Sequence, residues 1–597
     1  MTNRFVVVAS PDRPLPPSAA ALPGETTPLS LAWTPVRTHR WSDRSGSVHV
    51  ACWERDGSTT MTTGPDTVLV SGSPWPRHEV WLPGVSVLHA IAFAASSPGW
   101  DPAMDLGGAY ALASIDREGN GFVASDPLGL HPLYVAEEAS FTVVSDRADL
   151  VADAIGRCTG RRPTRSTRCG AWLSFAAYLI GDETGFDGVR ALAAGEVVHL
   201  RNGRAEIVQG RVPWDVDPGA PLRDPDEVGE LLAADVVRCL RTTLARSSER
   251  PWFELTGGKD SRLLLGITAG AGLQDEFRYV TYGPDSLPDV QIAQTIATQL
   301  DLDHHRRSPG SASRSELSMA DRYRIHVQAT SGMSNCHESR LPDQRTAPVI
   351  SGLLGESYRT ANQGVADAQP RDWDDAADRF RRFRKFGDAG LLRPDAAQQL
   401  TDEAVAFHLS ARDRIRGPED LRPAYFLGCH LPRWQGPLVE SHPNRVLPFY
   451  SPAAIRGAFE MGCDARSTEH VHQRLVTRGS ASLAELPFAN DTWRTATAPR
   501  PEATRGPINS RRVARPRSRT ERTRVLRDIV DRCPDSALYD MVDPDALRDG
   551  IERFSSLRPL EKQQVMGAVT SLIWLGELEL RPTTDRLVSA TRDTADG

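Results

Sequence analysis

Short apolar runs separated by polar turns dominate the first 210 residues of the chain. The runs at 48–53, 67–70 and 141–144 are rich in valine, threonine and aromatic residues, and segments rich in glycine, proline and aspartate lie between them. This pattern is typical of strands joined by turns. We therefore predict an antiparallel sheet domain over residues 1–210.

The pattern changes after residues 210–221, which have the proline and glycine content of a linker. Asp224 followed by Pro225 predicts a helix start, because an aspartate caps the first amides and proline suits the first turn. Beyond it, apolar strand patterns alternate with helical patterns, at 252–255, 263–267, 279–282 and 289–300. This alternation predicts an α/β domain with a parallel sheet, over residues 222–597.

The last third of the chain is predicted to be mainly helical. Helical patterns return from about residue 372, and an apolar stripe at 565–575 marks a helix near the end. Residues 495–524 are thick with proline, serine and arginine and carry few large apolar side chains. That composition predicts a mobile loop.

The composition is that of an ordinary globular protein, with 40% hydrophobic and 25% charged residues and a net charge of −7. The acidic balance does not favour nucleic acid as a partner. No apolar run approaches the roughly 18 residues of a membrane span, and the apolar stretch near the start is too short for a signal peptide. We therefore expect a cytoplasmic protein. The eight cysteines show no pair at two-residue spacing, which favours buried free thiols over a zinc or redox site.

The sharpest chemical signal lies between the first strand and helix of the second domain, where the chain reads Leu255-Thr256-Gly257-Gly258-Lys259-Asp260-Ser261. Two glycines let backbone amides approach an anion, and the N-terminus of the following helix adds positive potential. Thr256 and Ser261 add hydroxyl donors, Lys259 adds a cation, and Asp260 is placed to hold magnesium. We predict a phosphate site here. The alternative is a plain strand-to-helix turn that uses its glycines for geometry alone.

This turn resembles the Ser-Gly-Gly-x-Asp-Ser pyrophosphate loop of the ATP-pyrophosphatase superfamily, in its asparagine synthetase-like branch. Tyr282, before a glycine, stands where that family has a residue against adenine. Ser351-Gly352, followed by Glu356, stands where the family has more phosphate contacts and a further metal ligand. The resemblance implies a PP-loop synthetase domain of the adenine nucleotide α-hydrolase type. It implies Mg²⁺ ligands at Asp260 and Glu356, and ATP-binding residues at Leu255, Thr256, Gly257, Gly258, Asp260, Ser261, Tyr282, Ser351 and Gly352.

The first domain resembles the class II glutamine amidotransferase domain, an αββα sandwich of the N-terminal nucleophile (Ntn) type. The matching stretches are 105–112, 124–134 and 144–146. The chain begins Met1-Thr2-Asn3, so the cysteine nucleophile of the glutaminases is missing. No stretch matches the one that holds glutamine, which also argues against Thr2 as a replacement nucleophile. We expect a sandwich without glutaminase activity.

Relatives with this loss include β-lactam synthetase and the lasso peptide macrolactam cyclases. The resemblance implies that ATP adenylates a carboxylate, pyrophosphate leaves and an amine attacks. Leu353 stands where β-lactam synthetase has tyrosine and asparagine synthetase has glutamate. A peptide α-amine, with a pKa of roughly 7.7–8.0, has less need of a base.

Our leading hypothesis is therefore an ATP- and Mg²⁺-dependent ligase that closes a lactam in a precursor peptide, as lasso cyclases do, with a leader-cleaving protease as a partner. One alternative is an intermolecular ligase that joins a small carboxylic acid to a free amine. The other is a scaffold without catalysis.

The family's late catalytic lysine is expected after Leu486-Pro487, where this chain has only arginines, at Arg494, Arg500, Arg505, Arg511 and Arg512. Either an arginine replaces that lysine or Lys562 reaches the site, so Lys259 and Lys562 are the candidate catalytic lysines. Asp289 is expected to cap the helix at 289–300. We expect structural roles for the histidines 304, 305, 430, 442 and 472, with nucleotide contact as the alternative for the first two.

Overall fold

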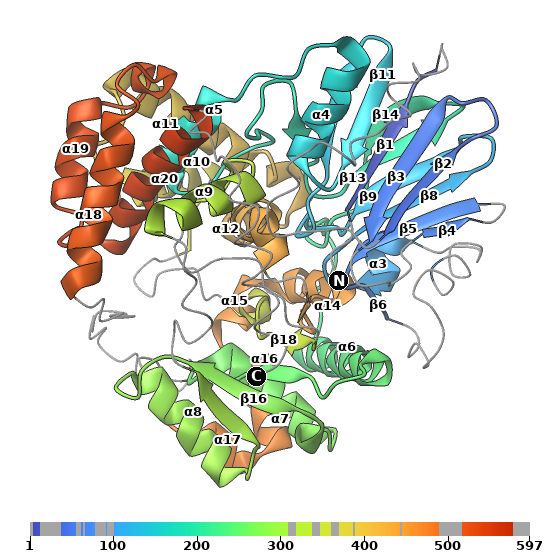
Figure 1. The fold of residues 1–597 in the computed structure, drawn as a ribbon. Coiled ribbons are helices and arrows are strands. Elements are labelled where there is room, and N and C mark those ends of the chain that lie inside the picture. The colour runs from blue at the N-terminus through green and yellow to red at the C-terminus, as the bar shows by residue number, and fades with distance from the viewer. Residues whose placement is uncertain are drawn as a thin grey trace.

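The fold is described from a computed structural model of the full chain. The described residues are 4–11, 37–54, 61–63, 66–77, 91, 101–307, 318–336, 347–359, 369–385, 389–441, 444–488, 493 and 516–576. Figure 1 shows three regions, which are a strand-rich sandwich, a parallel sheet with its helices, and a group of helices from the last part of the chain.

Two antiparallel sheets form the N-terminal sandwich. The first has the order β12 (Arg190–Ala191), β10 (Tyr134–Glu138), β11 (Phe141–Ser145), β1 (Arg4–Ala9), β3 (Val48–Glu54) and β2 (Arg37–Ser42). The second has the order β14 (Arg204–Gln209), β13 (Glu196–Arg201), β9 (Gly121–Ser125), β8 (Tyr110–Asp116), β5 (Asp66–Gly72) and β4 (Met61–Thr63). Buried side chains of both sheets, among them Val7, Val50, Leu69 and Ala113, form one core. The apolar strand runs therefore supply the shared inner faces of the two sheets.

Helix α4 (Ala148–Thr159) covers the outer face of the first sheet, where Val6 and Val8 pack against Leu150 and Val151. The outer face of the second sheet buries Val68 and Leu112 against Ile91 and Leu106. The residues flanking Ile91 lie outside the described residues. The structure therefore shows the two inner layers and one outer helix layer of the predicted αββα arrangement.

A five-stranded sheet, parallel throughout, forms the second region. Its order is β17 (His304–Arg307), β16 (Arg278–Tyr282), β15 (Trp252–Glu254), β18 (Val349–Ile350) and β19 (Arg445–Val446). The helices of this region are α6 (Pro225–Arg246), α7 (Lys259–Gly270), α8 (Pro288–Gln299), α16 (His470–Gly479) and α17 (Ala481–Glu485). Helix α6 begins as predicted, because the Asp224 carboxylate accepts the N–H of Asp226 and Pro225 occupies the first turn.

The segment with linker composition is not a free linker. Val212, Trp214 and Val216 are buried and belong to the apolar core around α6 and the parallel sheet. Composition alone misses this docking, because three apolar residues among prolines and glycines are enough to hold an irregular segment on a core.

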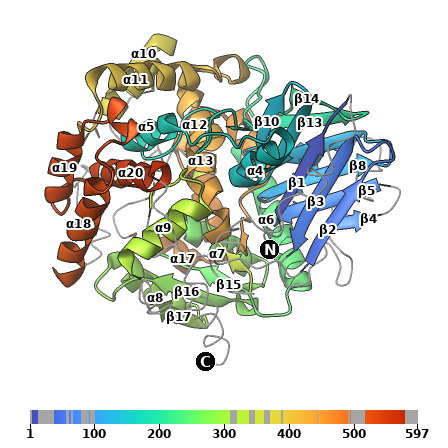
Figure 2. The same cartoon turned by 45° about the horizontal axis from the view of Figure 1, so that its top comes forward.

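The last region is helical, as predicted. Its main helices are α9 (Met319–Ala329), α10 (Trp373–Lys385), α11 (Pro394–Leu409), α18 (Pro516–Asp531), α19 (Pro544–Glu552) and α20 (Pro559–Leu575). Helix α20 packs on α5 (Thr167–Ala176) of the N-terminal half, and both helices share one core with the sandwich (Figure 2).

The loop prediction for 495–524 is wrong for 516–524, which form the start of α18; Leu526 and Val530 bury the apolar face of that helix. Residues 494–515 lie outside the described part of the chain. No helix in the described part is long and apolar enough to cross a membrane. All eight cysteines are free thiols, and seven of them are buried.

Buried aspartates join the sandwich to the parallel-sheet region. Asp126 accepts the N–H of Leu130 at 3.0 Å and of His131 at 2.8 Å, and it also accepts the hydroxyl of Tyr450. The Tyr450 oxygen in turn accepts the N–H of Leu128 at 2.8 Å. Because Tyr450 follows β19, this bond ties the sandwich to the carboxyl edge of the parallel sheet.

A second link lies nearby. Asp235 of α6 is fully buried and accepts Nε of Arg77 at 2.9 Å and the hydroxyl of Ser451 at 2.6 Å. Arg77 follows β6 (Trp75–Pro76) of the N-terminal half, and Ser451 caps α14 (Pro452–Glu460). The first link ends at Tyr450 and the second at the next residue, Ser451, so both connect the N-terminal half to the same edge of the sheet.

We expect Tyr450→Phe to destabilise the protein by roughly 1–3 kcal/mol, because the buried Asp126 carboxylate loses the hydroxyl that donates to it. Thermal unfolding of the two proteins checks this. The matched control is Tyr539→Phe, since the Tyr539 hydroxyl is buried with no hydrogen-bond partner among the described residues. A Tyr450→Phe protein that melts with wild type would show that the link contributes nothing.

Candidate functional site

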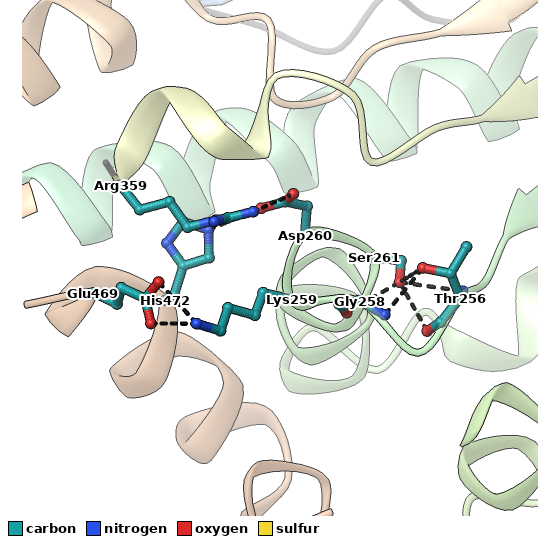
Figure 3. Close-up of polar contacts among 8 residues, drawn as sticks. All are labelled: Thr256, Gly258, Lys259, Asp260, Ser261, Arg359, Glu469 and His472. Atoms are coloured by element: carbon teal, nitrogen blue, oxygen red, sulfur yellow. Dashed lines mark hydrogen bonds and ion pairs between the residues drawn. The ribbon is translucent and has the colours of Figure 1, made fainter. Parts of the chain in front are cut away.

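The turn after β15 is closed by its own hydroxyls. The Thr256 N–H donates to Oγ of Ser261 at 3.2 Å, and that Oγ donates to the Thr256 carbonyl at 3.0 Å. The Gly258 N–H donates to Oγ1 of Thr256 at 3.1 Å. These bonds bend the chain directly from strand into helix, so the predicted turn is a defined structure (Figure 3).

The N-terminus of α7 is open to an anion. Its N-cap is Gly258, whose missing side chain leaves the first amides without a side-chain cap. Uncapped amides at the start of a twelve-residue helix carry partial positive charge and bind phosphate or carboxylate groups. Thr256 beside them is exposed. The structure therefore brings together the predicted phosphate donors of the first loop.

The loop after β18 lies against this turn because β18 pairs in parallel with β15, so both carboxyl ends meet at one edge. A Cβ on Gly352 would lie 3.1 Å from the Ser261 nitrogen, and one on Gly355 would lie 2.6 Å from Cβ of Asp260. Only glycine fits at this spacing. Leu354 between them has φ 75°, a left-handed conformation that costs a side-chain-bearing residue roughly 1–2 kcal/mol.

Arg359, at the end of this second loop, holds Asp260. Its Nε and NH2 donate to Oδ1 and Oδ2 of Asp260 at 3.0 and 2.8 Å. Nε2 of the buried His472 donates to the same Oδ1 at 3.3 Å. Burial alone would raise the pKa of Asp260, but the His472 hydrogen bond and the Arg359 charge outweigh burial and hold it well below its usual range. Asp260 is therefore ionised and already paired (Figure 3).

The pKa of Glu356 is shifted in the opposite direction from that of Asp260. Burial, and then the charge of Asp260, raise its pKa to about 7. Its carboxylate accepts the backbone N–H groups of Glu356 and Leu354, and among the described residues no ion pair reaches it. Of the acids in the two loops, Asp260 and Glu356, it is thus the one without an ion pair of its own.

These contacts decide how the residues fit a magnesium ion. Asp260 fits poorly, because Arg359 and His472 already take three of its roughly four lone-pair positions. Glu356 fits better, since no ion pair among the described residues reaches its carboxyl group. Within the described residues, no cluster of three or more His, Cys, Asp or Glu side chains could hold a metal ion. Of the two acids in the described loops, Glu356 is therefore the one more available to a divalent ion.

Lys259 points away from the turn. Its Nζ is buried and donates to both oxygens of Glu469, at 2.9 and 2.7 Å. The rings of Phe488 and Trp493 lie 5.5 and 5.8 Å from Nζ. Figure 3 shows this pair on the α16 side of the helix, opposite Thr256 and Ser261. The structure thus places Lys259 against α16 and not at the phosphate donors, and a catalytic role for it stays a prediction.

Arg262, one turn further along α7, fixes the segment that follows α17. Its guanidinium donates to the carbonyls of Leu486 at 2.6 Å and Pro487 at 2.8 Å. The ring of Phe488 stacks on it, with 3.9 Å between Cζ and the ring centroid. The chain expected to carry the family's lysine therefore starts beside the turn, but the arginines at 494, 500, 505, 511 and 512 lie outside the described residues.

The remaining predicted residues are dispersed. Tyr282 ends β16 and is 43% exposed, at the same carboxyl edge as the two loops. Leu255 is fully buried in the core, and Ser351 is buried at the start of the second loop. Lys562 is not brought to the site: it lies in α20, where its Nζ donates to the Ser555 carbonyl at 3.1 Å.

The prediction for Asp289 is wrong. Leu287 is the N-cap of α8, without a side-chain cap. The Asp289 carboxylate instead accepts the N–H of Gly257, so it supports the glycine turn from the neighbouring helix. His304 is structural, as expected, and bonds Oγ1 of Thr281 at 2.8 Å.

Two residues of the site, Arg359 and Glu469, were not predicted from the sequence, and a third, His472, was expected to be structural but bonds Asp260. Each comes from a segment with no motif of its own. A weak signal existed, because a lysine and an aspartate stand side by side at the start of a buried helix. When buried, the lysine needs an anion and the aspartate needs a cation or hydrogen-bond donors. Nothing in the sequence says which residues supply them.

The comparisons with known proteins add little to this geometry. No family model and no curated protein matches the chain. Among solved structures, an allosteric regulatory enzyme of purine biosynthesis is 11% identical over 53% of this chain and 68% of that chain, with a TM-score of 0.23. Glutamine phosphoribosylpyrophosphate amidotransferase from B. subtilis is 12% identical over 60% and 77%, with a TM-score of 0.22. A likeness this weak carries no argument about activity.

We expect Lys259→Met to destabilise the protein by about 3–5 kcal/mol, because it leaves the Glu469 carboxylate buried without a cation. Adding Glu469→Gln to that variant should recover most of the lost stability, since the buried carboxylate charge is then removed as well. Melting temperatures of the single and double variants check this. A double variant no more stable than Lys259→Met would mean that the charge pair is not the cause.

A pH prediction follows from Glu356. Its pKa is about 7 in the folded protein and 4.5 ordinarily, so folding takes up a proton between these values. The free energy of unfolding therefore falls as pH rises from about 4.5 to 7, by roughly 1–3 kcal/mol from this group. Glu356→Gln should remove that part of the slope. Urea unfolding of both proteins at pH 5 and 7.5 measures it, and parallel slopes would contradict the assignment.

Proposed function

We propose that the protein is an ATP-dependent, AMP-forming carbon–nitrogen ligase that adenylates a carboxylate and closes a lactam in a precursor peptide. The observation that carries the proposal is the contact of two turns at one edge of the parallel sheet, beside an uncapped helix N-terminus. The resemblance of both turns to the asparagine synthetase-like branch of the ATP-pyrophosphatases supports a nucleotide as the anion.

The chemistry would proceed in two steps. A carboxylate oxygen of the substrate attacks the α-phosphorus of ATP and pyrophosphate leaves. An amine nitrogen then attacks the acyl carbon, AMP leaves, and the amine loses a proton, so that an amide bond forms with net loss of one water between the carboxylic acid and the amine.

The chain's own groups suit the first step. The uncapped amides at the start of α7 and the exposed hydroxyl of Thr256 would donate to the charge that gathers on the leaving pyrophosphate. Mg²⁺, when bound with ATP, would neutralise phosphate charge. Exposed Tyr282, at the same edge, is the residue proposed to lie against adenine.

The second step needs positioning more than acid–base chemistry. When amine and carboxylate belong to one molecule, holding them together contributes on the order of 7–11 kcal/mol. The sandwich is bonded to the same sheet edge through Asp126–Tyr450, so it can form one wall around a substrate there. A precursor peptide and a leader-cleaving protease remain the proposed substrate and partner.

The decisive variant is Gly258→Asp. Its Cβ would meet only Oγ1 of Thr256, at 3.2 Å, and an aspartate N-cap stabilises a helix over a glycine N-cap by about a few tenths of a kcal/mol. The same carboxylate would occupy the anion position. We expect a higher melting temperature together with loss of ATP-dependent pyrophosphate release, whereas Gly258→Ala keeps the release.

The assay offers the protein ATP, Mg²⁺ and candidate precursor peptides or small carboxylic acids with amines, and measures pyrophosphate, AMP and product mass. Loss of one water within a peptide supports the lactam. A condensed product of two molecules supports intermolecular ligation instead. Unchanged pyrophosphate release by Gly258→Asp would refute the site, and no release with any substrate would favour a scaffold.

A further inference from the structure

We propose that the Arg359 guanidinium takes the place of a metal ion on Asp260, so that this site binds its nucleotide with a divalent cation at Glu356 only. The inference rests on the proposed function and concerns the cations of that same site. It departs from the pair of metal ligands, Asp260 and Glu356, that the sequence resemblance implies.

The first support comes from the hydrogen bonds that the two carboxylate oxygens of Asp260 already accept. A carboxylate has about four lone-pair positions. Arg359 takes one on each oxygen in a bidentate pair, and His472 takes a second one on Oδ1. A bidentate arginine is a permanent cation with fixed geometry. Only about one lone-pair position, on Oδ2, is left, and a metal ion bound there would lie beside the positive charge of Arg359.

The second support is that Arg359 is held in place. Its side chain is 12% exposed, and that of Asp260 is 25% exposed. The charges of Asp260, Glu469 and Glu356 all raise the pKa of Arg359, more than burial lowers it. Moving the guanidinium away would leave Asp260 ionised and partly buried without its partner, which costs several kcal/mol.

The third support is the balance of charge. Lys259 neutralises Glu469 and Arg359 neutralises Asp260, while Glu356 has no ion pair among the described residues. A triphosphate brought to the α7 N-terminus thus meets a site with little net positive charge. Among the described residues of the second loop, Glu356 is the carboxylate without an ion pair, so it is the group available to an added cation.

Manganese binding without nucleotide tests the metal part. Free Mn²⁺ is followed by electron paramagnetic resonance during titration of the full chain. We expect Arg359→Met to bind Mn²⁺ at least about tenfold more tightly than wild type, because two neighbouring carboxylates are then free. Arg359→Met with Glu356→Gln should lose that gain. The matched control is Arg527→Met, which breaks an exposed pair with Glu552.

Nucleotide binding without metal tests the arginine itself. A fluorescent ATP analogue is titrated in the presence of a chelator. We expect wild type to bind it, Arg359→Met to bind at least about tenfold more weakly, and Arg359→Lys to fall between them because a single ammonium replaces a fork of donors. Adding Mn²⁺ should restore binding to Arg359→Met more than it improves wild type.

The outcomes distinguish a failure of this inference from a failure of the proposed function. The inference is overturned, while ATP binding stands, if wild type and Arg359→Met bind Mn²⁺ equally well. It is also overturned if the Asp260→Asn substitution in the wild-type protein abolishes Mn²⁺ binding. A wild-type protein that binds no nucleotide with or without metal removes the proposed function, and this inference with it. Melting temperatures of each variant show whether a loss reflects unfolding.

Discussion

The parallel pairing of β15 with β18 is the constraint on which the candidate site depends. It brings the carboxyl ends of two strands that are almost a hundred residues apart in the chain to one edge, and Gly352 and Gly355 let the second loop touch the first turn. The bidentate pair of Arg359 with Asp260 follows from that approach. Without it, Arg359 and Glu356 would have no relation to Asp260.

The site is built from opposite charges that are matched across separate elements. Lys259 and Asp260 are neighbours in the chain, yet their partners come from α16 and from the second loop. Such buried pairs contribute little net stability, but removing one member is costly. They therefore fix how α7, α16 and the loop after β18 sit on one another more than they strengthen the fold.

The N-terminal sandwich is bonded to the carboxyl edge of the parallel sheet. Asp126 and Arg77, both from the N-terminal half, reach Tyr450 and Asp235 there. These bonds give a physical reason for the sandwich to lie against this edge, since breaking either would leave a buried aspartate short of a partner.

The sequence by itself determined the strand and helix alternation, the cap at Asp224, the glycine turn at 256–258 and the hydroxyls that close it, because these depend on neighbours along the chain. It did not determine the partners of Asp260 and Lys259, the helix at 516–524, the docking of 212–216 or the role of Asp289. Those are decided by which surfaces meet, and a residue's burial and charge partners are set by distant segments. Local patterns therefore located the glycine turn, whereas only the tertiary structure showed that its aspartate already has a cation.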